Sequence, residues 1–275
     1  MKSLRRYLNG RMARMKSTYR TVGEVAAFVV LVWGMLFFLF SGSENLGYHW
    51  QWYRIPKYFF SHKGGVLVSG PLVQGLLVTC RITLVSFVLS FAIGLATALL
   101  RLSHSIIGRG MARGYLEVIR NTPLLVQIFF VYFVLGPILG ISRFYAAVLA
   151  LSFFEGAYAS EIIRAGIVSM PRGQWDAAYS LGLTKLGAYR KVILPQAMRW
   201  VLPPLTSQAI SLVKDSALVS TIAVYDLTMR GQEIVSETYL VFEVWFTVAA
   251  VYLALALLLS AFISVMERRL RVPGA

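Results

Sequence analysis

Residues 171–204 read PRGQWDAAYSLGLTKLGAYRKVILPQAMRWVLPP, and they lie between apolar stretches that are long enough to cross a bilayer. The segment is too polar for hydrocarbon, because it carries several cationic side chains: Arg172, Lys185, Arg190, Lys191 and Arg199. Its pattern predicts two short helices, one at 172–181 and one from 185 to about 194. Two short helices between membrane spans indicate a surface that contacts another protein.

Glycine, threonine and proline mark the expected ends of these helices. Gly182 can adopt the left-handed conformation that ends the first helix, and Thr184 is the expected N-cap of the second. Pro195 is expected to end the second helix, and the pair Pro203 and Pro204 to mark the boundary with the next span.

The composition indicates an all-α membrane protein. Of the 275 residues, 57% are hydrophobic and 14% are charged, and the mean hydropathy is +0.67. A soluble domain carries about 25% charged residues. The net charge of +15 would suggest a nucleic-acid partner in a soluble chain. Here the basic residues crowd between apolar runs, so we interpret the charge through membrane topology and expect no nucleic acid.

Six apolar runs predict about six transmembrane helices: 22–40, 72–100, 123–141, 145–163, 205–225 and 244–265. We expect a basic cytoplasmic tail at 1–21, an N-terminal anchor span at 22–40 and an aromatic periplasmic loop at 41–70. Six crossings place both ends of the chain inside. The same parity places the basic segments 101–121 and 164–204 inside and the acidic loop 226–243 outside, as the positive-inside rule requires.

Two of these spans have expected local features. Arg81 interrupts the second run, which predicts a half-helix at 72–80, then a span at 82–100, with the arginine reaching outward. Thr122 and Pro123 are the expected N-cap and first residue of the third span.

The motif Asp176-Ala177-Ala178, Gly182 and then Val192-Ile193-Leu194-Pro195 resembles the loop motif of ABC importer permeases. That motif is Glu-Ala-Ala, three residues, Gly, nine residues, Ile, any residue, Leu and Pro. The spacing agrees throughout, and the two departures, Asp for Glu and Val for Ile, are conservative.

Further motifs resemble the branch of that family that carries polar amino acids of the histidine, glutamine, glutamate and arginine type. They are Arg120–Gln127 (RNTPLLVQ), Gly156-Ala157-Tyr158 with Glu161, Arg164 and Gly166, Gly173-Gln174, and Lys214–Leu218 (KDSAL). The resemblance covers roughly residues 66–270. It implies the type I fold of ABC importer permeases at 71–270, with the span at 22–40 as an addition.

The resemblance also implies partners. The chain has no phosphate-loop motif, so ATP hydrolysis is expected in a separate cytoplasmic ATP-binding subunit, and the chain itself is expected to be no enzyme and to hold no cofactor or metal. A periplasmic amino-acid-binding protein, membrane lipid and a second permease subunit, identical or homologous, complete the expected set. We name residues 171–204 the coupling segment, because its first helix is expected to insert into a groove of the ATP-binding subunit. The residues implied in this contact are Gly173, Asp176, Ala177, Ala178, Gly182, Leu194 and Pro195.

Ionisable residues within apolar spans are costly and mark a pathway or a buried pair. Glu155 can provide an anionic partner for the ammonium group of an amino acid, and Tyr158 lies one turn further on the same helix face. Lys214 can meet the carboxylate, as can a helix end. A structural pairing of Lys214 with Glu155 or Asp215 stays open beside this reading.

Arg120, Glu161 and Arg164 lie at the cytoplasmic ends of spans, where we expect snorkelling or interhelical ion pairs that brace the coupling segment. An alternative function is an ion-coupled secondary transporter that uses Glu155 and Asp215 as proton or sodium sites. A membrane-embedded enzyme is disfavoured, because no nucleophile–base pair or metal cluster is visible.

Overall fold

The computed structural model describes residues 23–270 except 36, 39–40, 43–46 and 64. The predicted basic tail at 1–21 lies outside these residues. The chain divides into two units, 1–51 and 52–275. In the first unit, an apolar helix at Gly23–Met35 occupies part of the predicted anchor span, and its side chains are exposed. The predicted length of that span, 22–40, stays a prediction.

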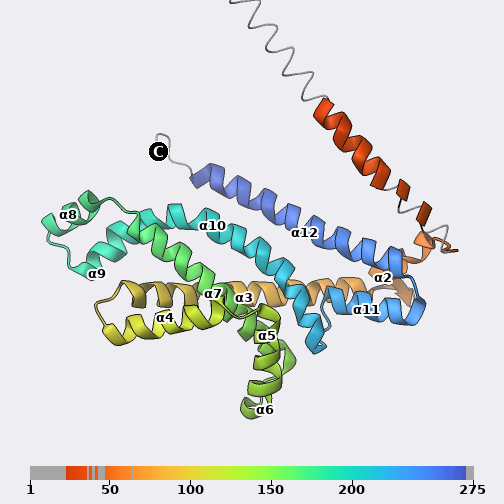
Figure 1. The fold of residues 1–275 in the computed structure, drawn as a ribbon, viewed down its shortest axis with the longest axis horizontal. Helices are drawn as coiled ribbons and strands as arrows, with labels where there is room; N and C mark the ends of the chain where they lie inside the picture. Colours follow the sequence, from red (N-terminus) through yellow and green to blue (C-terminus); the bar gives the residue numbers. More distant parts are fainter. Residues whose placement is uncertain (1–22, 36, 39–40, 43–46, 64, 271–275) are drawn as a thin grey trace, which may run out of the picture. The chain divides into compact units, whose positions relative to one another are not determined.

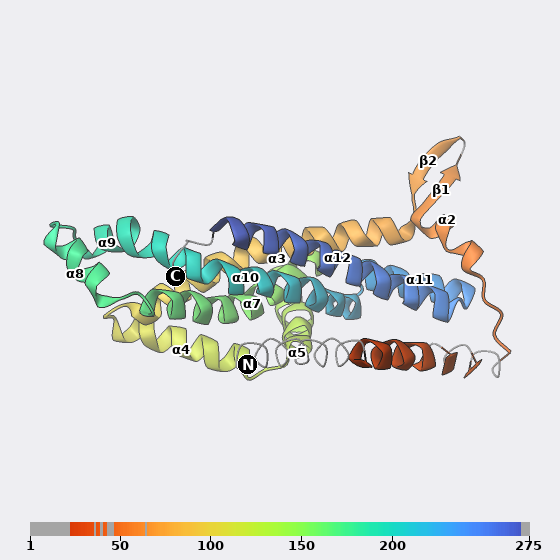
Figure 2. The ribbon, with the colours of Figure 1, turned by 90° about the horizontal axis from the view of Figure 1, so that it is seen from above.

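The second unit is helical apart from one hairpin (Figures 1 and 2). Its elements are, in order, η1 (Trp52–Arg54), α2 (Pro56–Phe59), β1 (Phe60–Lys63), β2 (Val66–Ser69), α3 (Pro71–Leu102), α4 (Ile106–Arg120), α5 (Leu124–Phe129), η2 (Phe130–Leu135), α6 (Gly136–Leu139), α7 (Arg143–Val168), α8 (Arg172–Ser180), α9 (Lys185–Ala188), η3 (Tyr189–Ile193), α10 (Leu194–Asp215), η4 (Ser216–Ile222), α11 (Leu227–Thr238) and α12 (Val241–Leu270). The two strands are antiparallel, with register from Phe60↔Ser69 to Lys63↔Val66.

The helices α3 and α7 form the centre of this unit because small residues let their backbones approach closely. A Cβ on Gly94 would lie 2.8 Å from the Cβ of Ala159, and one on Gly156 would lie 2.9 Å from Ile93. Such contacts between small residues drive helix association within membranes. The helix α3 is continuous through Arg81, so the expected half-helix at 72–80 is wrong. Isolated arginine is a good helix former and does not break a helix.

A sharp bend precedes the third predicted span. The helix α4 runs beside α3, and the segment from α5 to α6 is bent by 107° relative to α4 (Figure 1). Pro123 is the N-cap of α5 and not its first residue. The hydroxyl of Thr122 instead donates to the carbonyl of Val118, at 2.8 Å, and so closes the end of α4. The expected N-cap role of Thr122 is therefore wrong.

Prolines in the coupling segment do not end helices. The helix α9 continues through the π-helical η3 into α10, and Pro195 directly follows this π-helical turn as the second residue of α10. Pro203 and Pro204 lie inside α10. Both expected boundaries are therefore wrong. In a packed helix, π-helical turns such as η3 and neighbouring groups can satisfy the backbone that prolines disturb.

The predicted acidic loop 226–243 is largely a helix, α11, and its start is buried. The carboxylate of Asp226 caps α11 by accepting from the backbone N–H of Met229 at 2.8 Å. The backbone N–H of Leu227 donates to the hydroxyl of Thr79 on α3 at 3.1 Å. A Cβ on Gly75 would lie 2.7 Å from the carbonyl oxygen of Asp226, so only glycine permits this contact.

Within the residues that the structure describes, three helices are long and apolar enough to cross a membrane: Pro71–Leu102, Arg143–Val168 and Val241–Val265. The bent pair from Ile106 to Leu139 would make a fourth if it counts as one span. The helical membrane fold is thus confirmed, and the number of six spans stays a prediction.

The helix α3 carries two arginines, Arg81 and Arg101, that are 20 residues apart. In a straight helix this interval measures about 30 Å, which equals the thickness of the hydrocarbon core.

Candidate coupling and translocation sites

Gly182 ends α8 as the sequence predicts. Its φ is +75°, in the left-handed region, and a Cβ there would meet no atom within 4 Å. The N–H of Gly182 donates to the carbonyl of Tyr179 at 2.9 Å, and that of Leu183 to Ala178 at 3.1 Å. This pair of bonds satisfies the last carbonyls of α8 in the Schellman arrangement. Thr184 then caps α9 by accepting from the N–H of Gly187 at 3.2 Å, which confirms the predicted N-cap.

The two faces of α8 differ. Ala178 is 1% exposed because it packs within its own chain. Gly173, Asp176 and Ala177 are exposed, and a Cβ on Gly173 would meet open space. Ala177 is therefore open to a partner, whereas Ala178 is covered by its own chain, and the contact of both alanines with the ATP-binding subunit stays a prediction. Leu181 is 80% exposed at the tip and joins this surface.

The inner face of α8 is anchored to the base of α10. The rings of Trp175 and Tyr189 pack edge to face with centroids 4.8 Å apart. The amide of Gln196 donates to the side-chain oxygen of Gln174 at 2.9 Å. Force applied to the exposed face of α8 can pass through these contacts into α10. Of the two remaining predicted residues, Leu194 is half-buried and Pro195 is exposed.

A second group of predicted residues lies near the middle of α7. Glu155 is 1% exposed, and its Oε2 accepts from the side-chain amide of Gln208 on α10 at 2.6 Å. Its Oε1 has no hydrogen-bond partner in the described part of the chain. Buried polar atoms are almost always paired, since an unpaired one costs about 1–3 kcal/mol. A further donor at Oε1 would therefore be favourable, and a role of Glu155 in the substrate pathway stays a prediction.

The other three predicted pathway residues lie on α7 and at the end of α10. Asp215, at the end of α10, is half-buried and interacts electrostatically with Glu155 and with Lys214. Lys214 is exposed and makes no ion pair within 4 Å in the described residues, so the predicted structural pairing of its ammonium group is not seen. Tyr158 is half-buried, and its ring packs on Phe154 at 5.2 Å between centroids.

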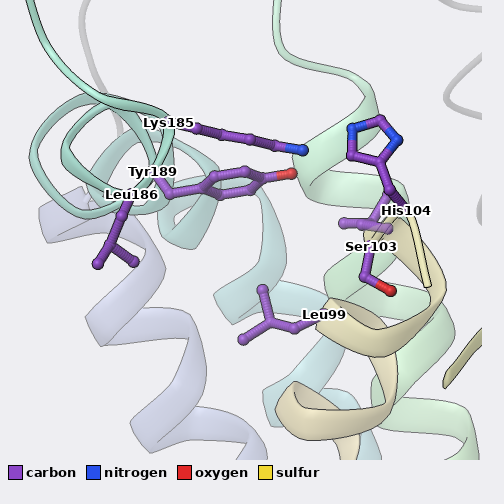
Figure 3. Close-up of a pocket in the computed structure, with 7 residues that line it drawn as sticks. Leu99, Ser103, His104, Lys185, Leu186 and Tyr189 are labelled. Carbon is purple, nitrogen blue, oxygen red and sulfur yellow. The ribbon is translucent and has the colours of Figure 1, made fainter.

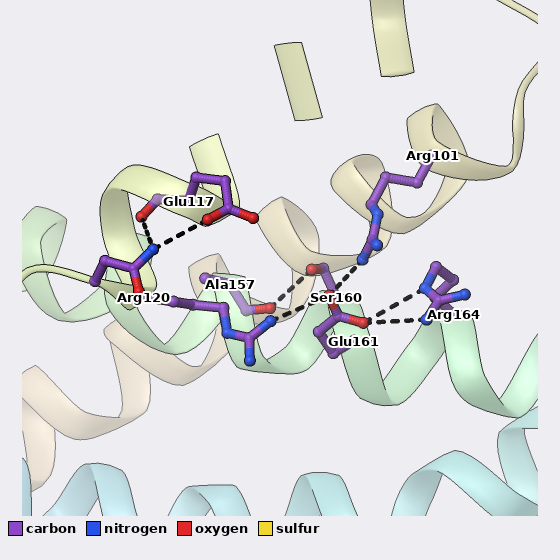
Figure 4. Close-up of polar contacts among 8 residues, drawn as sticks. Arg101, Glu117, Arg120, Ala157, Ser160, Glu161 and Arg164 are labelled. Atoms are coloured by element: carbon purple, nitrogen blue, oxygen red, sulfur yellow. Dashed lines mark hydrogen bonds and ion pairs between the residues drawn. The ribbon is translucent and has the colours of Figure 1, made fainter. Parts of the chain in front are cut away.

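An ion-pair cluster on α7 joins the last turn of α3 to the last turn of α4 (Figure 4). Glu161 on α7 pairs through Oε1 with Arg101 and, at 3.4 Å, with Arg120, and through Oε2 with Arg164 at 3.4 Å. The predicted ion pairs of Arg120, Glu161 and Arg164 are thus confirmed. Their role as a brace for the coupling segment stays a prediction.

Sequence reasoning missed three contributors. Gln208 gave no signal because a glutamine in a polar stretch has many ordinary roles. The sequence places Arg101 only in a basic segment, whereas in the structure it lies on the last turn of α3. Leu181 adjoins the helix-ending Gly182, and an apolar residue at a solvent-exposed helix end is the signal that could have indicated it.

Residues 90–272 match the protein family described as binding-protein-dependent transport system inner membrane component. The chain belongs to this family. It is therefore an integral inner-membrane permease component of an ABC importer, a class that works with a separate ATP-binding subunit and a substrate-binding protein.

Relatives and solved structures agree with this assignment. The permease is 41% identical over 202 residues to the L-cystine transport system permease protein TcyB of Bacillus subtilis, with 72% of this chain and 86% of that protein covered. It is 37% identical over 204 residues to the glutamine transport system permease protein GlnP of Escherichia coli K12, with 73% and 93% covered.

The fold of this permease also matches solved transporters. An amino acid ABC transporter crystallised with histidines matches with a TM-score of 0.67 at 40% identity, over 72% of this chain and 94% of that one. The methionine ABC transporter MetNI in an inward-facing form matches with a TM-score of 0.63 at 24% identity, over 73% and 96%, and this likeness concerns the fold alone. The predicted fold of ABC importer permeases is confirmed.

Proposed function

We propose that this permease translocates a polar amino acid across the inner membrane by alternating access. The observation that carries the proposal is the unpaired Oε1 of Glu155, a buried carboxylate oxygen near the middle of α7. An amino-acid ammonium group supplies the charge-assisted donor that this oxygen lacks. Lys214 then meets the substrate carboxylate, with Asp215 and Tyr158 beside it. The relatives named for glutamine and cystine transport support an amino acid as substrate.

The energy enters at the coupling segment. The exposed face of α8 (Gly173, Asp176, Ala177, with Leu181 at its tip) docks into the ATP-binding subunit, and closure of two such subunits moves α8 against its partner in a second permease subunit, identical or homologous. Trp175, through its contact with Tyr189, passes that movement to α10. Because Gln208 on α10 holds Glu155, the movement changes the environment of the proposed substrate site.

Uptake by proteoliposomes tests the proposal. The permease is reconstituted with its ATP-binding subunit and the amino-acid-binding protein is added outside. These proteoliposomes should accumulate labelled amino acid only when ATP is enclosed in their lumen, on the side of the ATP-binding subunit. The permease alone should accumulate none under a proton or sodium gradient. Gradient-driven uptake by the permease alone would establish the alternative, an ion-coupled secondary transporter.

The proposed orientation places both chain ends, 1–21 and the residues after α12, in the cytoplasm, together with the coupling segment. Thiol labelling in whole cells tests it in a Cys80→Ala background. Ala177→Cys should react only after the inner membrane is permeabilised, because Ala177 is exposed on the proposed inner side. Glu237→Cys on α11 should react in cells whose inner membrane is intact. Labelling of Ala177→Cys from outside would overturn the coupling assignment.

A further inference from the structure

A cavity of about 360 Å³ lies between α3 and the coupling segment, away from the residues of the coupling motif (Figure 3). One wall is the last turns of α3 and the turn that follows, and the other is α9 with the start of η3. The lining residues are Leu99, Leu102, Ser103, His104, Lys185, Leu186 and Tyr189. None of the motif residues from Gly173 to Pro195 that we assign to coupling lines it.

The lining combines two chemistries. The leucines of both walls form the apolar part of the lining, and Lys185, Tyr189 and His104 form a polar rim. In Figure 3 the amine of Lys185 and the hydroxyl of Tyr189 both point toward the ring of His104. No acidic residue lines the cavity, and Lys185 makes no ion pair within 4 Å in the described part of the chain. An ammonium group, a phenol and an imidazole can all donate, so the rim suits an anion with several acceptor oxygens.

The position of the cavity along α3 matches a membrane boundary. If Arg81 and Arg101 mark the two sides of the hydrocarbon core, about 30 Å apart, then Leu99 lies just inside one boundary and His104 just outside it. Leu99 thus lies at the depth of acyl chains, and the donors around His104 lie at the depth of lipid phosphates. The surrounding segments 101–120 and 164–204 carry ten arginines and lysines against two acids, which favours an anionic lipid surface.

We propose that this cavity binds an anionic phospholipid of the inner leaflet, with its headgroup phosphate on Lys185, Tyr189 and His104 and the start of one acyl chain on the leucines. The bound lipid joins α9 to the end of α3. It thereby holds the base of the coupling segment, since Tyr189 also packs on Trp175 of α8. The inner-leaflet location rests on the proposed orientation of the permease.

The test uses the permease in complex with its ATP-binding subunit, in nanodiscs of mixed phosphatidylglycerol and phosphatidylethanolamine. Native mass spectrometry after detergent extraction counts the phospholipids that stay bound. We expect phosphatidylglycerol to be retained in preference to phosphatidylethanolamine. Lys185→Gln should reduce that retention about fivefold, because one lysine near an anionic surface contributes about 1 kcal/mol. Leu186→Ser, at an exposed position that leaves folding unaffected, should also reduce it.

Lys191→Gln is the matched control, an exposed lysine of the same segment that does not line the cavity, and it should change retention less than twofold. Equal retention of both lipids, or equal loss in Lys185→Gln and Lys191→Gln, would overturn the proposal. Inorganic phosphate at millimolar concentration should not displace the lipid, and displacement would assign the rim to free phosphate instead. Retention is measured without transport, so a chain that binds lipid but supports no ATP-driven uptake refutes the proposed function alone.

Discussion

The side-chain amide of Gln208 on α10 donates to Glu155 on α7, with 2.6 Å between Nε2 and Oε2. This bond fixes one oxygen of a buried carboxyl group and leaves Oε1 without a partner among the described residues. It also ties the helix that would carry the substrate site to the helix that begins in the coupling segment. A substrate bound at Oε1 and an ATPase bound at α8 are therefore linked through α10.

Replacement of Glu155 by glutamine should weaken transport without weakening assembly. The variant keeps the size of the side chain and removes its negative charge, and a hydrogen bond to a charged group contributes about 1.5–3 kcal/mol. We therefore expect an apparent substrate affinity about tenfold to a hundredfold lower in proteoliposome uptake, with the ATP-binding subunit bound as in the wild type. Glu117→Gln is the control, because Glu117 is an exposed carboxylate of α4. Unchanged affinity and rate in Glu155→Gln would remove Glu155 from the pathway.

Replacement of Gly182 by aspartate should uncouple ATP hydrolysis while the complex still reaches the membrane. Gly182 has a φ of +75° and open space around it, so aspartate, which tolerates this conformation, fits into the chain. The new negative charge and bulk then lie at the tip of the proposed docking surface. Stimulated ATP hydrolysis should fall at least tenfold, which is about 1.4 kcal/mol of docking.

Two controls separate conformation from charge in this experiment. Gly182→Asn tests the same backbone without the charge and should retain more activity. Gly140→Asp, at a second exposed glycine with φ of +66° far from α8, should retain all of it. If Gly182→Asp transports normally, the coupling surface lies elsewhere.

The sequence predicted the coupling segment well because its signals are local. Gly182 and Thr184 act through backbone conformation and hydrogen bonds within three residues, so their roles can be deduced without tertiary structure. The prolines misled the prediction because their effect on a helix depends on what surrounds it: Pro195 follows the π-helical turn η3, and Pro203 and Pro204 lie inside α10.

The partners of charged residues were harder to predict because they come from distant parts of the chain. Gln208 lies 53 residues from Glu155, and Arg101 lies 60 residues from Glu161. Only the packing of α7 against α3 and α10 brings them together. The charge pattern showed that Glu155 needed a partner, but nothing local to it indicated which of several polar residues it was.

The start of α11 should make stability depend on pH. Asp226 is fully buried, and burial raises its pKa from 3.8 to about 6, although Met229, Thr228 and Tyr252 hydrogen-bond to the carboxylate and oppose the shift. The folded chain thus holds the proton more tightly than the unfolded chain. The contribution of Asp226 to the free energy of unfolding is therefore largest below pH 3.8. It is lost as the pH rises through 6, and the loss is about 3 kcal/mol at most.

Asp226→Asn should abolish this component of the pH dependence. Asparagine is as good an N-cap as aspartate, so α11 stays capped and no charge is buried at neutral pH. Thermal unfolding of the purified permease at about pH 5 and pH 7.5 measures the effect. Between these two pH values, the melting temperature of the wild type should fall by several degrees more than that of the variant. The histidines titrate equally in both proteins, so their effect cancels when the two shifts in melting temperature are subtracted. Parallel pH profiles would show that Asp226 is ionised without penalty in the folded chain.

The cluster around Glu161 should stabilise the packing of α3 and α4 on α7 more than a surface ion pair does. Glu161 and Arg101 have only 28% and 20% of their side chains exposed, and one carboxylate serves three arginines. Glu161→Gln leaves these arginines repelling one another, so we expect a loss of about 1–2 kcal/mol and a melting temperature lower by roughly 2–8 °C. Glu233→Gln, which breaks the single pair with Arg230 on α11, should cost less.

In a double-mutant cycle, Arg101→Gln and Glu161→Gln should show a coupling energy of at least about 0.5 kcal/mol, because removing either partner already breaks their shared contact. Additive effects would mean that the contact between Arg101 and Glu161 contributes nothing to stability.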